Sequence, residues 1–187
     1  MDPIRFIIIT VPPNPLKEKL SSLMQILSMK ADTHTAISYP PHITLRTGAL
    51  VPVDQVDSFM KGFESHLEGC SPFTIQLGDI LSKTYFSDGM EKQIMFYDVL
   101  QTTELVDLNK RLLDYKPFIK SNKTSFSPHL SLAYNDLTAE GLSSLKEWTG
   151  KNPDQLPSEK HWTCDTVSFY YKPESKWQCY HDFKVSG

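Results

Sequence analysis

Two short stretches of the chain have the same pattern of residues, Pro41-His42-Ile43-Thr44-Leu45 and Pro128-His129-Leu130-Ser131-Leu132. Each reads proline, histidine, aliphatic, hydroxyl, leucine, and a second copy by chance is expected on the order of once in a thousand chains of this length. In a strand, successive side chains point to opposite faces, so each histidine shares a face with the hydroxyl two positions later. The two stretches therefore predict equivalent strands whose aliphatic faces pack against helices.

The elements around these stretches occur in the same order twice. Runs rich in β-branched and aromatic residues predict strands at 4–11, 42–46, 73–81, 93–99, 127–132, 162–171 and 177–183, the last two as a hairpin. Apolar residues at helical spacing predict four helices, with Asn14, Asp54, Thr103 and Thr138 as their caps and Gly150 at the end of the last. Each half then reads strand, helix, histidine strand, helix, strand.

This order predicts an α+β fold. We expect residues 1–187 to form a single bilobal domain made of two pseudo-duplicated halves, about 1–86 and 90–187. Helices are expected outside antiparallel sheets, and the histidine faces of the sheets are expected to line a central cleft, a common place for a ligand.

Composition narrows the functional classes. The formal charge is −3 and the basic residues are scattered, so we expect a small or end-bound anionic substrate rather than an extended track for nucleic acid. The apolar run 6–11 is too short to span a membrane, and Cys70, Cys164 and Cys179 have no paired spacing that predicts a disulfide framework or a zinc site. We expect a cytoplasmic monomer with no membrane contact, no metal and no cofactor.

Two imidazoles, each beside a hydroxyl, suit the cleavage of a phosphodiester. One imidazole can accept a proton from water while the other protonates the departing oxygen, because the usual histidine pKa is about 6.5. The hydroxyls of Thr44 and Ser131 can donate hydrogen bonds to phosphate oxygens. A lone strand histidine is more often structural, but the repetition favours catalysis by His42 and His129.

The remaining histidines lack this repeated context, and we expect them to be surface or structural residues: His34, His66, His161 and His181. The chain also lacks a P-loop, a G-x-S-x-G elbow, an H-E-x-x-H motif and a dinucleotide glycine fingerprint. These absences argue against the commonest rival chemistries.

The tetrapeptides at 42–45 and 129–132 resemble the paired H-x-T/S-hydrophobic signatures of the two-histidine phosphoesterase superfamily, and the resemblance spans most of the chain. Its members include bacterial 2'-5' RNA ligase-like proteins, but the stretch 129–134 is most similar to plant and fungal 2',3'-cyclic nucleotide phosphodiesterases. The resemblance implies a bilobal fold with His42 and His129 as the acid/base pair. It also implies that Thr44 and Ser131 bind phosphate and that Tyr134 lies near the nucleotide.

Further nucleotide contacts are predicted at four positions. Strict alternation puts Tyr134 on the face opposite Ser131, so only a bulge or a strand end can bring it to the substrate. Arg46 shares the histidine face by alternation, although an exposed arginine at a strand end is equally common. Tyr85 and Phe86, in the expected loop before the second half, are candidates to stack a base, with core packing or a solvated loop as the alternative.

The function that the resemblance implies is metal-independent hydrolysis of a cyclic phosphodiester to a 2'-phosphomonoester. The expected substrate is a small nucleotide or an RNA terminus: a 2',3'-cyclic nucleotide, an RNA end or the cyclic phosphate of ADP-ribose. Two alternatives remain, a 2'-5' RNA phosphodiesterase or ligase-like enzyme and a non-catalytic module that binds RNA ends. Which histidine is the base depends on the polarity of the substrate.

Overall fold

The computed structural model describes residues 2–87, 89–115, 126–173 and 177–185. Within these ranges the chain forms eight strands and four α-helices, with three short 3-10 helices at 36–38, 53–55 and 153–155. The strands are β1 (Ile4–Thr10), β2 (Ile43–Val51), β3 (Phe73–Ser87), β4 (Met90–Val99), β5 (His129–Tyr134), β6 (His161–Cys164), β7 (Thr166–Tyr171) and β8 (Gln178–Lys184). The helices are α1 (Leu16–Ala31), α2 (Val56–Leu67), α3 (Thr103–Asp114) and α4 (Ala139–Lys151).

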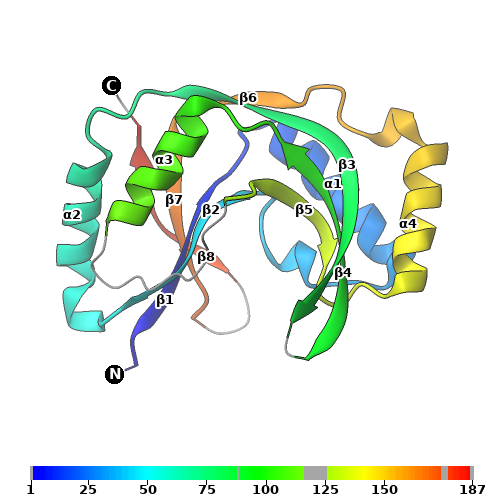
Figure 1. The fold of residues 1–187 in the computed structure, drawn as a ribbon, viewed down its shortest axis with the longest axis horizontal. Coiled ribbons are helices and arrows are strands. Elements are labelled where there is room, and N and C mark those ends of the chain that lie inside the picture. The colour runs from blue at the N-terminus through cyan, green and yellow to red at the C-terminus, as the bar shows by residue number, and fades with distance from the viewer. Residues whose placement is uncertain (1, 88, 116–125, 174–176, 186–187) are drawn as a thin grey trace.

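The strands form one sheet in the order β6-β3-β4-β5-β2-β1-β7-β8, and every neighbouring pair is antiparallel. The two histidine strands, β2 and β5, meet in the middle, where the described residues pair only through Ile43 and Leu130. We call β1, β2, β7 and β8 half A of the sheet, and β3, β4, β5 and β6 half B. Figure 1 shows the strands of the two halves diverging from this narrow junction.

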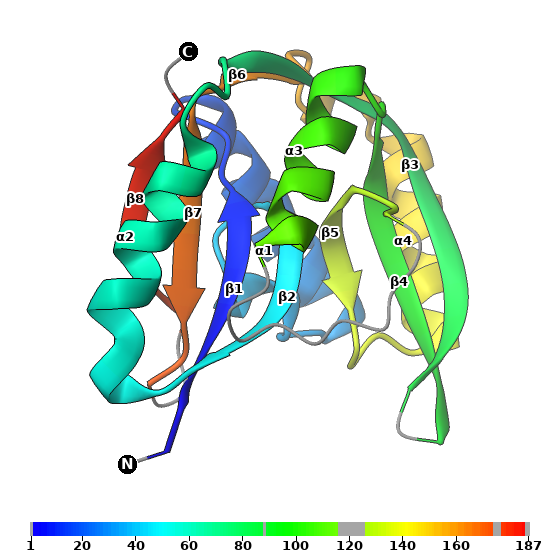
Figure 2. The ribbon, with the colours of Figure 1, turned by 60° about the vertical axis from the view of Figure 1, so that its left-hand side comes forward.

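The helices cover the two halves in pairs (Figures 1 and 2). On half A, Phe63 of α2 packs edge-on against Phe169 of β7 at a centroid distance of 4.4 Å, and Asn109 of α3 donates a hydrogen bond to the Leu45 carbonyl of β2. On half B, α1 and α4 pack on each other and on β5 and β4. No helix in the described ranges has the length and apolar content needed to cross a membrane.

Each half of the sheet combines distant parts of the chain. Half A joins β1 and β2 to the late strands β7 and β8, whereas half B joins β3 to β4, β5 and β6. In addition, α1 lies between β1 and β2 in the sequence but packs on β5 of half B. The two halves of the sheet are therefore not two consecutive segments of the chain.

The predicted α+β class is confirmed, and the elements follow the predicted order with one exception. The strand expected at 162–171 is two strands, β6, which pairs with β3 in half B, and β7, which pairs with β1 in half A. Helix starts were predicted less well. Thr138 does cap α4, because its side chain accepts a hydrogen bond from the Gly141 backbone at 3.0 Å. The predicted caps Asn14 and Asp54 are wrong: Pro15 holds the cap position of α1, and a 3-10 helix at 53–55 precedes α2.

Two further boundaries differ by one residue each. Thr102 rather than Thr103 caps α3, with its hydroxyl accepting from the Leu105 backbone. Gly150 does not end α4, which continues to Lys151. A glycine near a helix end ends it only where the chain takes up the left-handed conformation, and Gly150 is not among the residues with positive φ.

The strand β3 is longer than predicted. It continues to Ser87, which pairs with Met90, so Tyr85 and Phe86 lie in a strand and not in the expected loop. The connection to β4 is short, and Gly89 within it has a φ of 73°, a conformation that favours glycine.

Candidate active site

The side chains of the histidine strands alternate between exposed and buried as predicted. Four on one face are partly exposed: His42, Thr44, His129 and Ser131. Four on the other face are buried: Ile43, Leu45, Leu130 and Leu132. The aliphatic face packs into the core, which leaves the imidazoles and hydroxyls on the accessible side of the sheet.

The junction between β2 and β5 brings these groups together. An antiparallel register through Ile43 and Leu130 puts His42 beside Ser131 and Thr44 beside His129. Side chains directly opposite each other are about 5 Å apart at Cβ, and diagonal neighbours such as the two histidines are about 7–8 Å apart. Each imidazole thus has a hydroxyl from the other strand next to it.

Both histidine rings are held in the same way. Nδ1 of His42 donates to the Pro40 carbonyl at 2.7 Å, and Nδ1 of His129 donates to the Ser127 carbonyl at 2.9 Å. A carbonyl oxygen only accepts hydrogen bonds, so Nδ1 carries a hydrogen in both rings. Exchange of a proton with a substrate therefore goes through Nε2 of each ring.

The electrostatics of the pair also indicate proximity. Burial lowers the pKa of His42 below its usual value, the hydrogen bond to Pro40 opposes this, and the charge of His129 lowers it further. A like charge nearby disfavours a second proton. The two histidines accordingly favour a state in which only one of them is protonated.

A β-bulge occurs at the equivalent place in both strands. In β2, Leu45 is the extra residue between the pairs of Thr44 with Ile9 and of Arg46 with Ile8. In β5, residue 132 is the extra residue between the pairs of 131 with 96 and of 133 with 95. Each bulge lies three residues after the histidine and reverses the alternation beyond that point.

This reversal turns Arg46 away from the histidines. Arg46 is 7% exposed, and its guanidinium donates a hydrogen bond to the Leu112 carbonyl in the last turn of α3. Burial lowers the pKa of Arg46, while Asp114 opposes this effect. The expectation that Arg46 shares the face of His42 is therefore wrong, because alternation across a bulge does not hold.

The same reversal has the opposite effect on Tyr134. Leu132 and Ala133 are both buried and Tyr134 is partly exposed, so Tyr134 returns to the face of His129. Its hydroxyl interacts with Tyr39, and Tyr85 and Asp136 are close enough to act on it electrostatically. Burial and these neighbours raise the pKa of Tyr134, so the hydroxyl stays protonated.

Aromatic rings flank both histidines. Tyr39 lies beside His42 at 5.3 Å between ring centroids and is stacked on Trp177 at 4.9 Å. Phe96 packs edge-on against His129, with 5.2 Å between the ring centroids. These rings continue the site on either side of the histidine pair.

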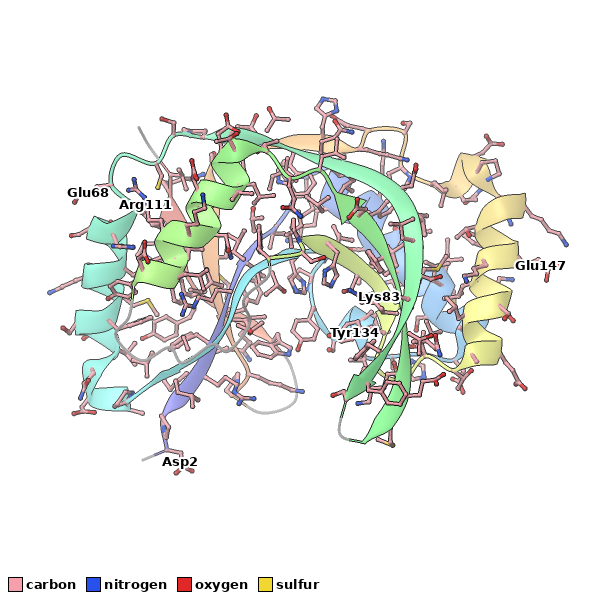
Figure 3. The ribbon with its side chains drawn as sticks, in the orientation of Figure 1. Asp2, Glu68, Lys83, Arg111, Tyr134 and Glu147 are labelled. Atoms are coloured by element: carbon pink, nitrogen blue, oxygen red, sulfur yellow. The ribbon has the colours of Figure 1, made fainter. Side chains whose placement is uncertain are left out.

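A lysine lies next to this group. The Lys83 ammonium is 5.3 Å from the centroid of the Phe96 ring. The same ring also contacts His129. In Figure 3 the labelled Lys83 and Tyr134 lie between the two halves of the sheet. Lys83 and Tyr85 are two residues apart in β3 and so share a face, whereas Phe86 points to the opposite face and is 78% exposed.

Asp136 connects the two histidine-bearing segments. Its carboxylate accepts hydrogen bonds from the Thr33 hydroxyl and from the backbone of His34 and Thr35, at 2.7 Å and 3.1 Å for the two backbone bonds. Burial alone would raise the pKa of Asp136, but these hydrogen bonds outweigh it and lower the pKa. Asp136, two residues after the end of β5, thus fixes the segment 33–35 that leads to His42.

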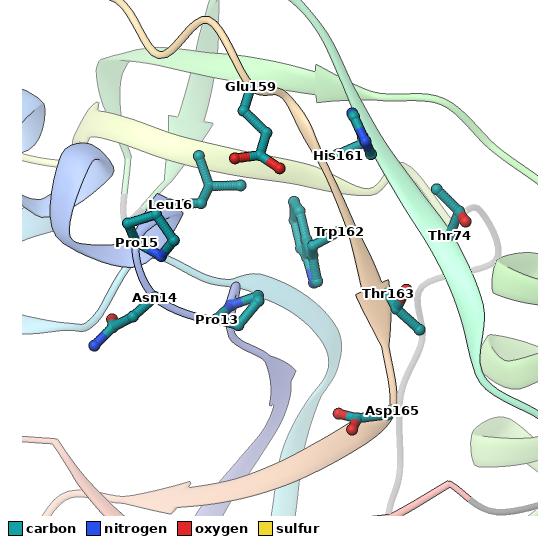
Figure 4. A pocket seen from close by; sticks show the side chains of 10 residues that line it. All are labelled: Pro13, Asn14, Pro15, Leu16, Thr74, Glu159, His161, Trp162, Thr163 and Asp165. Atoms are coloured by element: carbon teal, nitrogen blue, oxygen red, sulfur yellow. The ribbon is translucent and has the colours of Figure 1, made fainter.

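One cavity among the described residues lies away from the histidine pair. It has a volume of about 460 Å³ and is lined by ten residues: Pro13, Asn14, Pro15, Leu16, Thr74, Glu159, His161, Trp162, Thr163 and Asp165 (Figure 4). None of the predicted site residues lines it. Among the described residues no three His, Cys, Asp or Glu side chains gather as metal ligands do.

The other histidines have local roles on or near the surface. His34 pairs with Asp32 at 3.2 Å, and Nε2 of His66 donates to the Arg111 carbonyl at 2.6 Å. His161 lines the cavity of Figure 4. His181 packs beside Phe183, with 4.5 Å between the ring centroids.

Sequence reasoning did not assign four residues of this group: Tyr39, Lys83, Phe96 and Asp136. Tyr39 had a signal, because it directly precedes the prolines before His42. Lys83 and Phe96 needed the full length and register of β3 and β4, and Asp136 needed the position of the 33–35 segment. These depend on long-range pairing, which local patterns do not specify.

Comparisons with known proteins agree with the geometry. The sequence profile of the 2'-5' RNA ligase superfamily matches residues 12–175. A Halalkalibacterium halodurans protein named as a candidate phosphoesterase is 24% identical over 178 residues, which cover 93% of each chain. The cyclic phosphodiesterase of Arabidopsis thaliana is 26% identical over 137 residues, which cover 73% of this chain and 68% of that protein.

A solved structure has the same architecture. That of E. coli LigT complexed with 3'-AMP aligns over 100% of both chains with a TM-score of 0.64 and 12% sequence identity. At this identity the likeness concerns the fold alone.

Proposed function

This chain belongs to the 2'-5' RNA ligase superfamily of two-histidine phosphoesterases, and we propose that it hydrolyses a cyclic phosphodiester between His42 and His129 without a metal. The substrate class is a 2',3'-cyclic phosphate on a nucleotide or an RNA end, or the cyclic phosphate of ADP-ribose. The product is the 2'-phosphomonoester. The similarity to the Arabidopsis cyclic phosphodiesterase supports the choice of a cyclic substrate.

One observation carries the proposal. Two histidines from adjoining strands have matching Nδ1 hydrogen bonds to the carbonyl two residues earlier, and each lies beside a hydroxyl of the other strand. Two structural histidines have no reason to share this arrangement. An acid/base pair needs it, because one Nε2 must reach the attacking water and the other the departing oxygen, on opposite sides of one phosphorus.

The reaction follows from this arrangement. One imidazole takes a proton from water as the water oxygen bonds to phosphorus. The other imidazole gives its proton to the ribose 3' oxygen as the bond from that oxygen to phosphorus breaks. Thr44 and Ser131 donate hydrogen bonds to the non-bridging oxygens, whose charge increases in the transition state.

The test is turnover of a panel of 2',3'-cyclic nucleotides in the presence of a chelator. We expect hydrolysis to 2'-phosphates, and a loss of roughly a thousandfold or more in kcat/KM for His42→Ala and for His129→Ala. His161→Ala, a histidine at the distant cavity, is the matched control and should retain activity. Loss of wild-type turnover on removal of divalent ions would contradict the mechanism.

A second candidate is the cleavage or joining of 2'-5' linkages in RNA, which the description of the matching family favours. Turnover of 2'-5' oligoadenylate together with inert cyclic nucleotides would establish it instead. A non-catalytic module would bind an RNA end in both histidine variants and release no product over long incubation.

The proposal includes a small nucleotide or RNA terminus as partner, a monomeric state and a cytoplasmic location. All three cysteines, Cys70, Cys164 and Cys179, are unbridged, which fits a reducing compartment.

A further inference from the structure

Lys83 and two tyrosine hydroxyls form a cluster beside the histidine pair that the hydrolysis itself does not use. We propose that Lys83, Tyr85 and Tyr134 bind a second phosphate, carried on the 5' oxygen of the same ribose whose cyclic phosphate is opened. The inference rests on the proposed function and specifies its substrate. It predicts a preference for cyclic phosphates that bear a further anionic group.

The position of Lys83 separates it from the scissile phosphate. Its ammonium lies over the Phe96 ring at 5.3 Å, and the same ring meets His129 at 5.2 Å. Phe96 is 7% exposed, so it packs into the sheet as the neighbour of both groups. The ammonium is therefore close to the histidine pair but displaced from it by one aromatic side chain.

The tyrosines extend the cluster along the same face. Tyr85 follows Lys83 by two residues in β3, so their side chains share a face, and Tyr85 lies close enough to Tyr134 to act on it electrostatically. The bulge in β5 turns Tyr134 to the same side. Burial raises the pKa of Tyr134, so its hydroxyl stays protonated; that hydroxyl is hydrogen-bonded to Tyr39, and its proton turns to the phosphate when the phosphate binds.

These groups match the chemistry of a phosphate. A lysine offers a point charge with three donors, and protonated tyrosines add neutral donors. Among the described side chains that we place around the histidines, Lys83 is the cation that we assign to this phosphate, because Arg46 is turned towards α3 and Lys92, opposite Tyr85 in β4, donates a hydrogen bond to Asn135 at 2.6 Å. The cyclic phosphate has a single negative charge, which a protonated histidine can balance, so Lys83 remains to pair with another anion.

The experiment compares adenosine 2',3'-cyclic phosphate with the same compound bearing a 5'-phosphate. We expect the wild type to favour the 5'-phosphorylated compound by about three- to tenfold in kcat/KM, the range between an exposed ion pair and a charge-assisted hydrogen bond. Lys83→Met, which keeps the apolar stem, should bring this ratio close to one. Lys83→Arg should restore most of it.

Controls separate this effect from general damage. Lys110→Ala removes a cation on the outer surface of α3, where Lys110 pairs with Asp107, and should leave the ratio unchanged. Raising the salt concentration should reduce the wild-type ratio, because exposed charges are screened. That measurement and Lys83→Arg test the proposal even where Lys83→Met fails to fold.

The outcomes also separate this inference from the proposed function. If the wild type hydrolyses neither compound, and neither a cyclic phosphate on an RNA end nor that of ADP-ribose, the proposed function itself fails. If it hydrolyses both but Lys83→Met slows them equally, or the ratio is already one, only the second phosphate site is overturned.

Two sources supply a 5'-phosphate of this kind: the next phosphodiester of an RNA chain and the diphosphate of ADP-ribose. A dinucleotide ending in a cyclic phosphate and ADP-ribose cyclic phosphate represent them. We expect Lys83→Met to lower kcat/KM for at least one of these two substrates more than it does for the unphosphorylated nucleotide. The substrate with the larger loss in kcat/KM identifies the source. Losses no larger than that of the unphosphorylated nucleotide would overturn the inference.

Discussion

At the scale of single residues, the proline before each histidine has a physical role. The carbonyl that accepts from Nδ1 belongs to the residue before that proline, and the ring of the proline restricts the backbone between acceptor and histidine. Pro41 and Pro128 therefore hold both imidazoles in one orientation. The sequence displayed this pattern, but the acceptors became evident only in the structure.

A measurable consequence concerns the ionisation of His42. Since burial and the charge of His129 lower its pKa, titration by NMR should give His42 a pKa below about 6.5. In His129→Ala the pKa of His42 should rise but stay below that value, because burial remains. An unchanged pKa in His129→Ala, with His161→Ala as the control, would show that the rings do not interact.

The same shift has a defined sign for stability. The unfolded chain binds this proton more tightly than the folded protein, so His42 lowers the free energy of unfolding as the pH falls below about 6.5.

At the scale of the elements, two bulges decide which side chains share the face of the histidines. Alternation correctly predicted the faces of His42 and His129 and of the hydroxyls two positions later. It failed for Arg46 because Leu45 is an extra residue in β2. Bulges depend on the partner strand, so a pattern within one segment does not predict them.

Asp136 gives a test of how the elements are joined. Asp136→Asn removes the charge that three donors share, and because Asp136 is exposed we expect a loss of about 0.5–1.5 kcal/mol in the free energy of unfolding. Because the 33–35 segment leads to His42, kcat/KM should fall as well. Chemical denaturation and steady-state kinetics measure the two effects.

Asp107→Asn on the exposed surface of α3 is the matched control, and it should be nearly neutral. Wild-type stability and activity in Asp136→Asn would show that this contact does not fix the segment.

At the scale of the whole molecule, the chain interleaves its elements. The order of strands and helices could be predicted from apolar spacing, but the sheet half that each helix covers could not. The leucine stripe of α1 fits either half, and only the three-dimensional contacts place it on β5. Similarly, nothing local indicates that β7 pairs with β1.

Interleaving predicts that the molecule unfolds as one unit. Residues 1–87 expressed alone should not fold, because α1 lacks β4 and β5, and β1 lacks β7. Circular dichroism and proton NMR of this fragment should show an unfolded chain, and the intact protein should melt in a single transition. A folded fragment would mean that the first pseudo-repeat is independently stable.

The narrow contact through Ile43 and Leu130 also affects how constant the spacing of the two imidazoles is. If half A swings against half B about this point, displacement grows with distance from the axis, so the tip of the β3–β4 hairpin travels farthest. The imidazoles flank the axis and travel least. Such a motion would open and close the space between the halves while the spacing of the two imidazoles stays nearly constant.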